Sequence, residues 1–192
     1  MGTNPDDHSL GAGDPTEDEW FILNRELFVE RPELEEEFFS LEGDPRHVVS
    51  KEGVDWLKEA AMGERACLTR LLFNGGRFAA FYALSSAQVE ITSPKNCERL
   101  GMLGTGRVPA SHMEWVVRSR LFKGVGERIL LHASAVARDV AQMQGNLVLT
   151  LDPYDDGTAS MWKTYGFMDS NTILGDGLRR MWLPLVGYRS LS

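Results

Sequence analysis

The sequence has little cysteine and no long hydrophobic run. Cys67 and Cys97 are its only cysteines, too few and too far apart for a disulfide framework or a metal knuckle. No uninterrupted apolar stretch approaches the roughly 18 residues that a membrane-spanning helix needs. Residues 1–15 lack the basic flank and the apolar centre of a secretory signal. We therefore expect a soluble, cytoplasmic protein with no metal site and no membrane span.

Basic residues are scarce at the amino-terminal end of the chain. Residues 1–45 hold 14 acidic and 2 basic residues, whereas the other 147 residues carry 18 basic and 14 acidic ones. The net charge of −8 therefore combines an acidic leader with a mildly basic body. Because the acid is local, the net charge does not exclude an anionic ligand. We expect a leader over residues 1–45, disordered in its first 15 or so residues, and one domain over residues 46–192.

Helix and hairpin patterns open the domain. Ser50 can cap a helix that Gly63 can end. Residues 66–91 contain two β-like runs joined by a glycine turn, which is typical of a hairpin. Residues 92–110 are rich in glycine and proline and predict a long loop, a kind of segment that often carries function. These patterns predict a helix, a hairpin and a loop, in that order.

A strand, a glycine pair and a long helix follow. Strict alternation divides the strand over residues 111–120 into two faces, with His112, Glu114 and Val116 on one and Met113, Trp115 and Val117 on the other. The helix after the glycines has one apolar face at a 3.6-residue period, formed by Ile129, Leu130, Ala133, Val136, Ala137, Val140 and Met143. Gly145 is placed to end this helix.

The carboxyl-terminal part predicts a strand, a short helix and a last strand. Residues 146–152 form a nearly continuous apolar run, as expected of a central strand covered on both faces. Asp155 or Asp156 can cap the short helix, which closes near Gly166. Arg179 and Arg180 are expected on an exposed strand edge. The element order favours an α+β fold with a mostly antiparallel sheet and one βαβ unit.

Gly124 and Gly126 leave two interpretations open. Backbone N–H groups at a helix start, exposed by glycines that have no side chain, bind phosphate well, and Lys123 could add a charge. A plain tight turn explains the glycines equally simply. The stretch lacks the third glycine of the Rossmann fingerprint and the Gly-Lys-Ser/Thr of the P-loop, so both of those nucleotide sites are excluded.

Two motifs in this part of the chain resemble one enzyme family. The stretches "EWVVRS" and "RLFKGVGERILL" are similar to motif A of the GNAT acetyltransferase superfamily, and "DPYDDGTASMWKTYGF" is similar to its motif B. "VDWLKEAA" and "GGRFAAFYALSSAQV" are similar to segments of the acetyltransferase toxins of bacterial toxin–antitoxin pairs. The resemblance implies a GNAT-like mixed sheet with helices on both faces, splayed between its fourth and fifth strands.

The resemblance also implies a binding site for acetyl-CoA in that splay. The pyrophosphate would bind backbone amides of the turn, namely Phe122, Lys123, Gly124, Val125, Gly126 and Glu127. The pantetheine arm would pair with the strand backbone, namely Trp115, Val116, Val117 and Arg118. Trp162 would lie beside the cofactor, where many members of the family carry the tyrosine that protonates the leaving thiolate. An indole cannot donate that proton, and Tyr165, one helical turn later, is the candidate substitute.

Acetyl transfer to an amine needs a general base. Glu114 and His112 are the candidates, although a solvated strand carboxylate and a hydrogen-bonded histidine would explain them as well. His132, Trp115 and Phe167 are expected to be structural. Trp162 is also a candidate core residue.

The expected function is acetyl-CoA-dependent N-acetylation of a primary amine. The acceptor is either a small molecule or protein amine, or an aminoacyl-tRNA in a toxin-like role with an antitoxin as partner. A homodimer is a further expectation from the resemblance. The alternative is a GNAT-fold module that binds CoA or a protein partner without turnover, and the indole of Trp162 is its main support.

Overall fold

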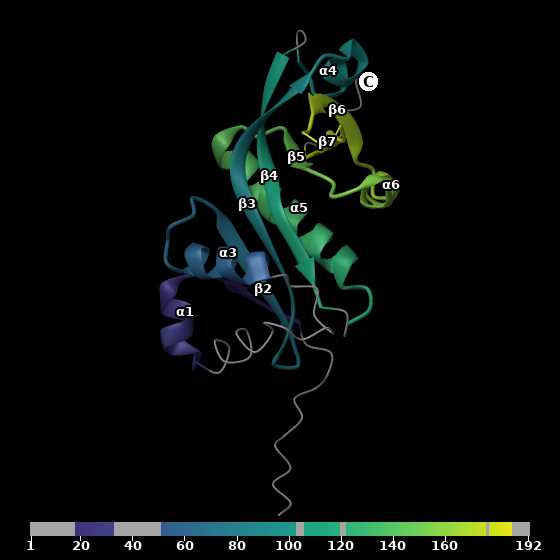
Figure 1. Cartoon of the computed structure of the whole chain (residues 1–192). Helices are drawn as coiled ribbons and strands as arrows, with labels where there is room; N and C mark the ends of the chain where they lie inside the picture. The colour runs from purple at the N-terminus through teal and green to yellow at the C-terminus, as the bar shows by residue number, and fades with distance from the viewer. Residues whose placement is uncertain (1–17, 33–50, 103–105, 120–121, 176, 186–192) are drawn as a thin grey trace, which may run out of the picture.

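A mixed sheet forms the centre of the molecule (Figure 1). The computed structural model describes residues 18–32, 51–102, 106–119, 122–175 and 177–185. The strands are β1 (Asp18–Ile22), β2 (Leu68–Asn74), β3 (Arg77–Ile91), β4 (Gly106–Arg118), β5 (Val148–Leu151), β6 (Met168–Ile173) and β7 (Arg179–Pro184). Their order is β1-β2-β3-β4-β5-β7-β6, and all neighbours are antiparallel except the parallel pair β4 and β5. The predicted α+β class with a mostly antiparallel sheet is confirmed.

Helices cover both faces of this sheet. The helices are α1 (Arg25–Glu30), α3 (Lys51–Ala61), α4 (Pro94–Arg99), α5 (Val125–Gln144) and α6 (Asp156–Thr164). Ile129 and Ala133 of α5 are buried with Tyr82 in one apolar cluster, whereas Trp56 and Leu57 of α3 are buried with Phe81 in a second cluster. Because Phe81 and Tyr82 are adjacent on β3, the two clusters lie on opposite faces of the sheet, as Figure 1 shows for α3 and α5. No described helix is long and apolar enough to cross a membrane.

The predicted hairpin is formed by β2 and β3. Asn74 pairs with Arg77, and Gly75 and Gly76 between them have φ angles of 56° and 73°. A two-residue turn with positive φ at both central positions has the type I′ geometry, whose twist matches that of the strands. The asparagine-glycine-glycine sequence therefore fixes the register of the hairpin.

The segment predicted as a loop over residues 92–110 is partly regular, so that prediction was wrong. Pro94 to Arg99 form α4, and β4 begins at Gly106. Ile91, Cys97 and Val108 are buried together with Trp182 in a third cluster. Burial of these apolar side chains outweighs the local glycine and proline signals on which the loop prediction rested. The far ends of β3 and β4 thereby form an arm that packs against β7.

Part of the acidic leader belongs to the sheet. β1 and α1 lie within residues 1–45, and β1 pairs with β2 along its whole length. Asp18 forms an ion pair with Arg128 of α5, and the Trp20 ring stacks on the ring of His132 with centroids 3.8 Å apart. The predicted disorder of the first 15 or so residues lies outside the described residues. β1 joins the leader to the helix that follows the glycine pair.

Candidate active site

A β-bulge in β4 corrects the predicted alternation of that strand. Ala83 of β3 pairs with Trp115, and the next residue, Leu84, pairs with Met113, so Glu114 has no partner on β3. Met113 and Val116 consequently share the α5 face, whereas Trp115 and Val117 pack on the α3 face. The prediction that grouped Met113 with Trp115 and Val117 was wrong. The unpaired Glu114 is an extra residue in β4, so the alternation of side chains between the two faces shifts by one residue at this point.

β4 and β5 separate just beyond this bulge. Their paired residues run from Ala110 with Val148 to Met113 with Leu151, and β5 ends there. β4 continues to Arg118, so the expected pantetheine-binding residues Trp115, Val116, Val117 and Arg118 lie on the stretch that β5 does not pair. Their backbone groups on that side are available to an extended ligand. The structure thus has a splayed edge at the predicted place.

The glycine pair opens α5. Gly124 is the N-cap with a left-handed φ of 73°, no side chain caps the helix, and the Arg128 N–H donates to the Gly124 carbonyl. The preceding N–H groups of Val125, Gly126 and Glu127 belong to the first turn and lack intrahelical acceptors. A Cβ atom on Gly124 or Gly126 would meet nothing within 4 Å. Free N–H groups at the start of a helix, with open space beside both glycines, fit a phosphate group.

The other residues of the predicted cradle differ in burial. Val125 is fully buried and Phe122 packs against the same cluster, so both anchor the turn on the sheet. Lys123 and Glu127 are exposed beside the turn. Along α5 the predicted apolar face is largely confirmed, but Met143 is 78% exposed, because it lies in the last turn beyond the sheet contacts, and Gly145 ends the helix with a φ of 74°.

His112 lies in a network of polar side chains on β4, β5 and β7. Its Nδ1 is 3.0 Å from the Thr150 hydroxyl, which donates to the Ser111 carbonyl at 3.5 Å. When Thr150 donates to Ser111, its oxygen accepts the Nδ1 proton of His112, and the lone pair of the imidazole is then on Nε2. Nε2 is 3.9 Å from Oδ2 of Asp152, and Arg180 binds both oxygens of that carboxylate at 2.7 Å.

The electrostatics of this network favour a neutral imidazole. Burial is the largest cause that lowers the pKa of His112, and the Arg180 charge lowers it further, whereas Asp152 and Glu114 raise it. A pKa below the ordinary value of about 6.5 leaves His112 unprotonated at neutral pH. The side chain is 12% exposed, so it is held in place and still reaches solvent. Its geometry and charge state suit a general base.

Glu114 is close to His112 although it does not share its network. The carboxylate is exposed at the bulge, and its charge raises the pKa of both His112 and the Cys67 thiol, although burial is the main cause for the thiol. The structure therefore brings both base candidates to the place where β4 and β5 separate. Only His112 has partners that fix its orientation.

Trp162 and Tyr165 occupy different environments on α6 and its end. Trp162 is 6% exposed and packs on Phe167, with ring centroids 5.4 Å apart, so it is a core residue. Tyr165 is 39% exposed at the C-cap position, and no described residue hydrogen-bonds its hydroxyl. Asp155 is the N-cap and accepts from the Thr158 N–H, as predicted. The phenol of Tyr165, unlike the indole of Trp162, is therefore accessible to a ligand.

Sequence reasoning missed three members of the His112 network, namely Thr150, Asp152 and Arg180. Arg180 was predicted on an exposed strand edge, but β7 lies between β5 and β6 and the Arg180 side chain is 21% exposed. Thr150 was overlooked because it lies within a run of mostly apolar residues. Asp152 is the last residue of that run and directly follows β5, and an acid at the carboxyl end of a buried strand was the available signal.

Comparisons with known proteins agree with this architecture. No protein-family model matches the chain, and no curated protein is similar to it in sequence. Among solved structures, AtaT complexed with acetyl-methionyl-tRNAfMet is 13% identical with a TM-score of 0.62, covering 88% of this chain and 95% of that one. A tyrosine-to-phenylalanine variant of KacT is 12% identical with a TM-score of 0.64, covering 88% and 96%.

A third structure contains a ligand of interest. It is a tyrosine-to-phenylalanine variant of the AtaT toxin bound to the C-terminus of the antitoxin AtaR and acetyl-CoA, 11% identical with a TM-score of 0.56, covering 88% of this chain and 94% of that one. At these identities the similarity establishes the fold alone. The chain has the GNAT-like α+β fold of AtaT and KacT.

Proposed function

We propose that the protein is an acetyl-CoA-dependent N-acetyltransferase that acts on a primary amine. The observation that carries this proposal is the position of a neutral, oriented histidine beside a splayed strand edge that leads to a glycine cradle. The cradle at Gly124 and Gly126 would hold the pyrophosphate, and the unpaired backbone of Trp115 to Arg118 would hold pantetheine. Acetyl-CoA bound to a GNAT-fold neighbour supports the same ligand for this chain.

His112 is the proposed general base. The amine nitrogen attacks the thioester carbonyl, the C–N bond forms, and the C–S bond breaks as the thiolate leaves. Nε2 of His112 takes the amine proton directly or through one water, and the Asp152 carboxylate stabilises the imidazolium that forms. Tyr165 is the proposed donor of a proton to the thiolate, because the buried indole of Trp162 has no acidic proton for this task.

The acceptor divides the proposal into two branches. The AtaT complex with acetyl-methionyl-tRNAfMet supports an aminoacyl-tRNA, and the AtaR complex supports an antitoxin partner. The charge pattern supports this branch weakly, since a surplus of four basic residues outside residues 1–45 is modest for a protein that neutralises several phosphates. A small amine is the other branch. A cytoplasmic location and a homodimer stay predictions from the sequence.

A CoA-binding module without turnover is the second candidate function. The observation that favours it is Trp162, because it fills the motif B position with a core side chain. The test is transfer of radiolabelled acetyl from acetyl-CoA to methionyl-tRNA and to a panel of small amines. Transfer to any of these amines supports the enzyme. Tight CoA binding without transfer to any of them supports the module and contradicts the proposed enzyme.

A further inference from the structure

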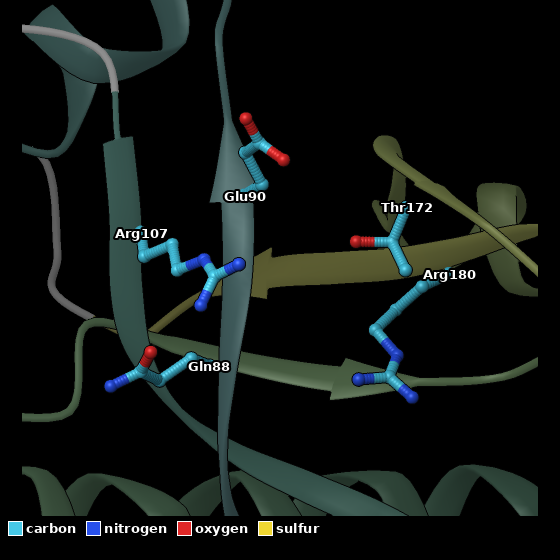
Figure 2. A pocket seen from close by; sticks show the side chains of 5 residues that line it. All are labelled: Gln88, Glu90, Arg107, Thr172 and Arg180. Carbon is cyan, nitrogen blue, oxygen red and sulfur yellow. The ribbon is translucent and has the colours of Figure 1, made fainter.

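A polar pocket lies beside the His112 network. It has a volume of about 320 Å³ and is lined by Gln88, Glu90, Arg107, Thr172 and Arg180. In Figure 2 the Arg107 guanidinium reaches from β4 across β3 toward the side on which Thr172 and Arg180 lie. The side chains come from the β3–β4 arm and from β6 and β7. The pocket therefore lies where the arm meets β6 and β7.

Two charges of opposite sign face this pocket. Glu90 and Arg107 are direct cross-strand partners on β3 and β4, and both are exposed. Opposite charges at such positions ordinarily pair with each other. Within the described part of the chain, however, neither forms an ion pair or a hydrogen bond with another residue. A carboxylate and a guanidinium are thus both available to a ligand.

Arg180 connects the pocket to the proposed base. Its guanidinium lines the pocket and binds Asp152 through both carboxylate oxygens, and Asp152 lies 3.9 Å from Nε2 of His112. Because Arg180 is already neutralised by Asp152, Arg107 is the cation that remains for a ligand. Arg180 is therefore the side chain that the pocket and the base network share.

We infer that this pocket holds the zwitterionic head of a small amino-acid acceptor whose second, distal amine is acetylated. The α-carboxylate would accept hydrogen bonds from Arg107, and the α-ammonium would donate to Glu90. A purely anionic head would be repelled by Glu90, and a purely cationic one by Arg107. The inference rests on the proposed acetyl transfer and favours its small-amine branch.

Three acceptors with the same distal amine test this inference. L-lysine carries both head charges, 6-aminohexanoate lacks the α-ammonium, and cadaverine lacks the carboxylate. Since a charge-assisted hydrogen bond is worth about 1.5 kcal/mol or more, we expect kcat/KM for lysine to exceed that of each analogue by about tenfold. A series with 2,4-diaminobutyrate and ornithine then measures the distance from the pocket to the reacting carbon.

Two variants test which side chain binds the α-carboxylate and which binds the α-ammonium of the acceptor. Arg107→Gln should remove the preference of lysine over cadaverine, by lowering kcat/KM for lysine and relieving the repulsion of cadaverine, and Glu90→Gln should remove the preference over 6-aminohexanoate. Arg65→Gln is the matched control, because Arg65 is exposed and pairs with Glu59 at the end of α3, away from the pocket. It should leave all three rates unchanged.

Lysine binding measured by calorimetry separates this inference from the proposed function. If Arg107→Gln weakens lysine binding about tenfold and no amine is acetylated, the inference about the pocket is supported and the proposed acetyltransferase activity is contradicted. If the three acceptors are acetylated with equal kcat/KM, or if the variants change the three kcat/KM values equally, the inference about the pocket is contradicted and the proposed acetyltransferase activity is supported. Transfer to methionyl-tRNA that is unaffected by Arg107→Gln, with no lysine binding, would also overturn the pocket.

Discussion

A single side chain, His112, connects the fold to the proposed chemistry. Thr150 fixes one ring nitrogen, and Asp152 lies near the other, so the ring is oriented by groups on β5 and directly after it. Arg180 then holds Asp152 from β7. The arrangement resembles the orientation of a base by a third group in other acyl-transfer sites.

The pKa of His112 gives the first prediction. Because the Arg180 charge lowers this pKa and Asp152 raises it, Arg180→Gln should move the acidic limb of the kcat/KM profile to higher pH, and Asp152→Asn should move it to lower pH. In the wild-type protein the limb should lie below about pH 6.5. The measurement is the pH profile with cadaverine as acceptor. Shifts in the same direction for both variants would contradict the network.

The phenol of Tyr165 gives a second prediction. Tyr165→Phe should lower kcat by about 100-fold if the hydroxyl protonates the thiolate, while the dissociation constant of acetyl-CoA stays the same. The free energy of unfolding should also stay the same, because no described residue hydrogen-bonds the hydroxyl. Steady-state kinetics and chemical denaturation measure both quantities. An unchanged kcat would exclude Tyr165 as the acid.

At the scale of the element, the start of α5 is the place where individual residues of the sequence can be related most directly to the proposed ligand binding. Gly124 has a left-handed φ, so a side chain there strains the backbone, whereas the φ of Gly126 is not left-handed. The two glycines therefore have different physical roles. The turn requires a glycine at position 124, whereas the backbone conformation at position 126 accepts any residue, so we propose that Gly126 serves the approach of the ligand.

Alanine variants separate these roles. Gly124→Ala should lower the free energy of unfolding by about 1 kcal/mol, the cost of a left-handed conformation. Gly126→Ala should raise it by about 0.5 kcal/mol through helix propensity, yet weaken acetyl-CoA binding by about tenfold, because its Cβ enters the space proposed for the phosphate. Denaturation and calorimetry measure the two effects. Full acetyl-CoA affinity in Gly126→Ala would show that the glycine pair is a plain turn.

Local patterns predicted the elements well and their three-dimensional partners poorly. The hairpin, the glycine-capped α5 and the Asp155 cap follow from turn chemistry and periodicity within a few residues, so one sequence suffices. The bulge at Glu114 depends on the register between β3 and β4, and the Arg180–Asp152 pair joins residues far apart in the chain. Such features arise from tertiary packing, which alternation and propensity do not contain.

At the scale of the whole molecule, β1 fastens the amino-terminal segment to the rest of the fold. Trp20 stacks on His132, His132 is 2.7 Å from the Tyr82 hydroxyl, and Asp18 pairs with Arg128. These contacts join the edge of the sheet to α5, the helix that opens at the cradle. The stability of the edge is therefore linked to the position of α5.

Trp20→Ala tests this connection. Loss of a half-buried indole should lower the free energy of unfolding by about 2 kcal/mol. Val29→Ala is the matched control, because Val29 is 78% exposed on α1 and should change stability by less than about 0.5 kcal/mol. Chemical denaturation of both variants measures the difference. Equal stability of Trp20→Ala and the wild-type protein would mean that β1 contributes nothing to the fold.

We propose that the whole fold places the neutral His112 beside bound acetyl-CoA, where its imidazole deprotonates an amine. The most direct test of this proposal is the initial rate of amine-dependent CoA release at saturating acetyl-CoA, for the wild-type protein and for His112→Ala. We predict a rate at least about 100-fold lower in the variant, as for loss of a general base, with acetyl-CoA affinity unchanged. A His112→Ala variant that releases CoA as fast as the wild-type protein would show that His112 is not the general base.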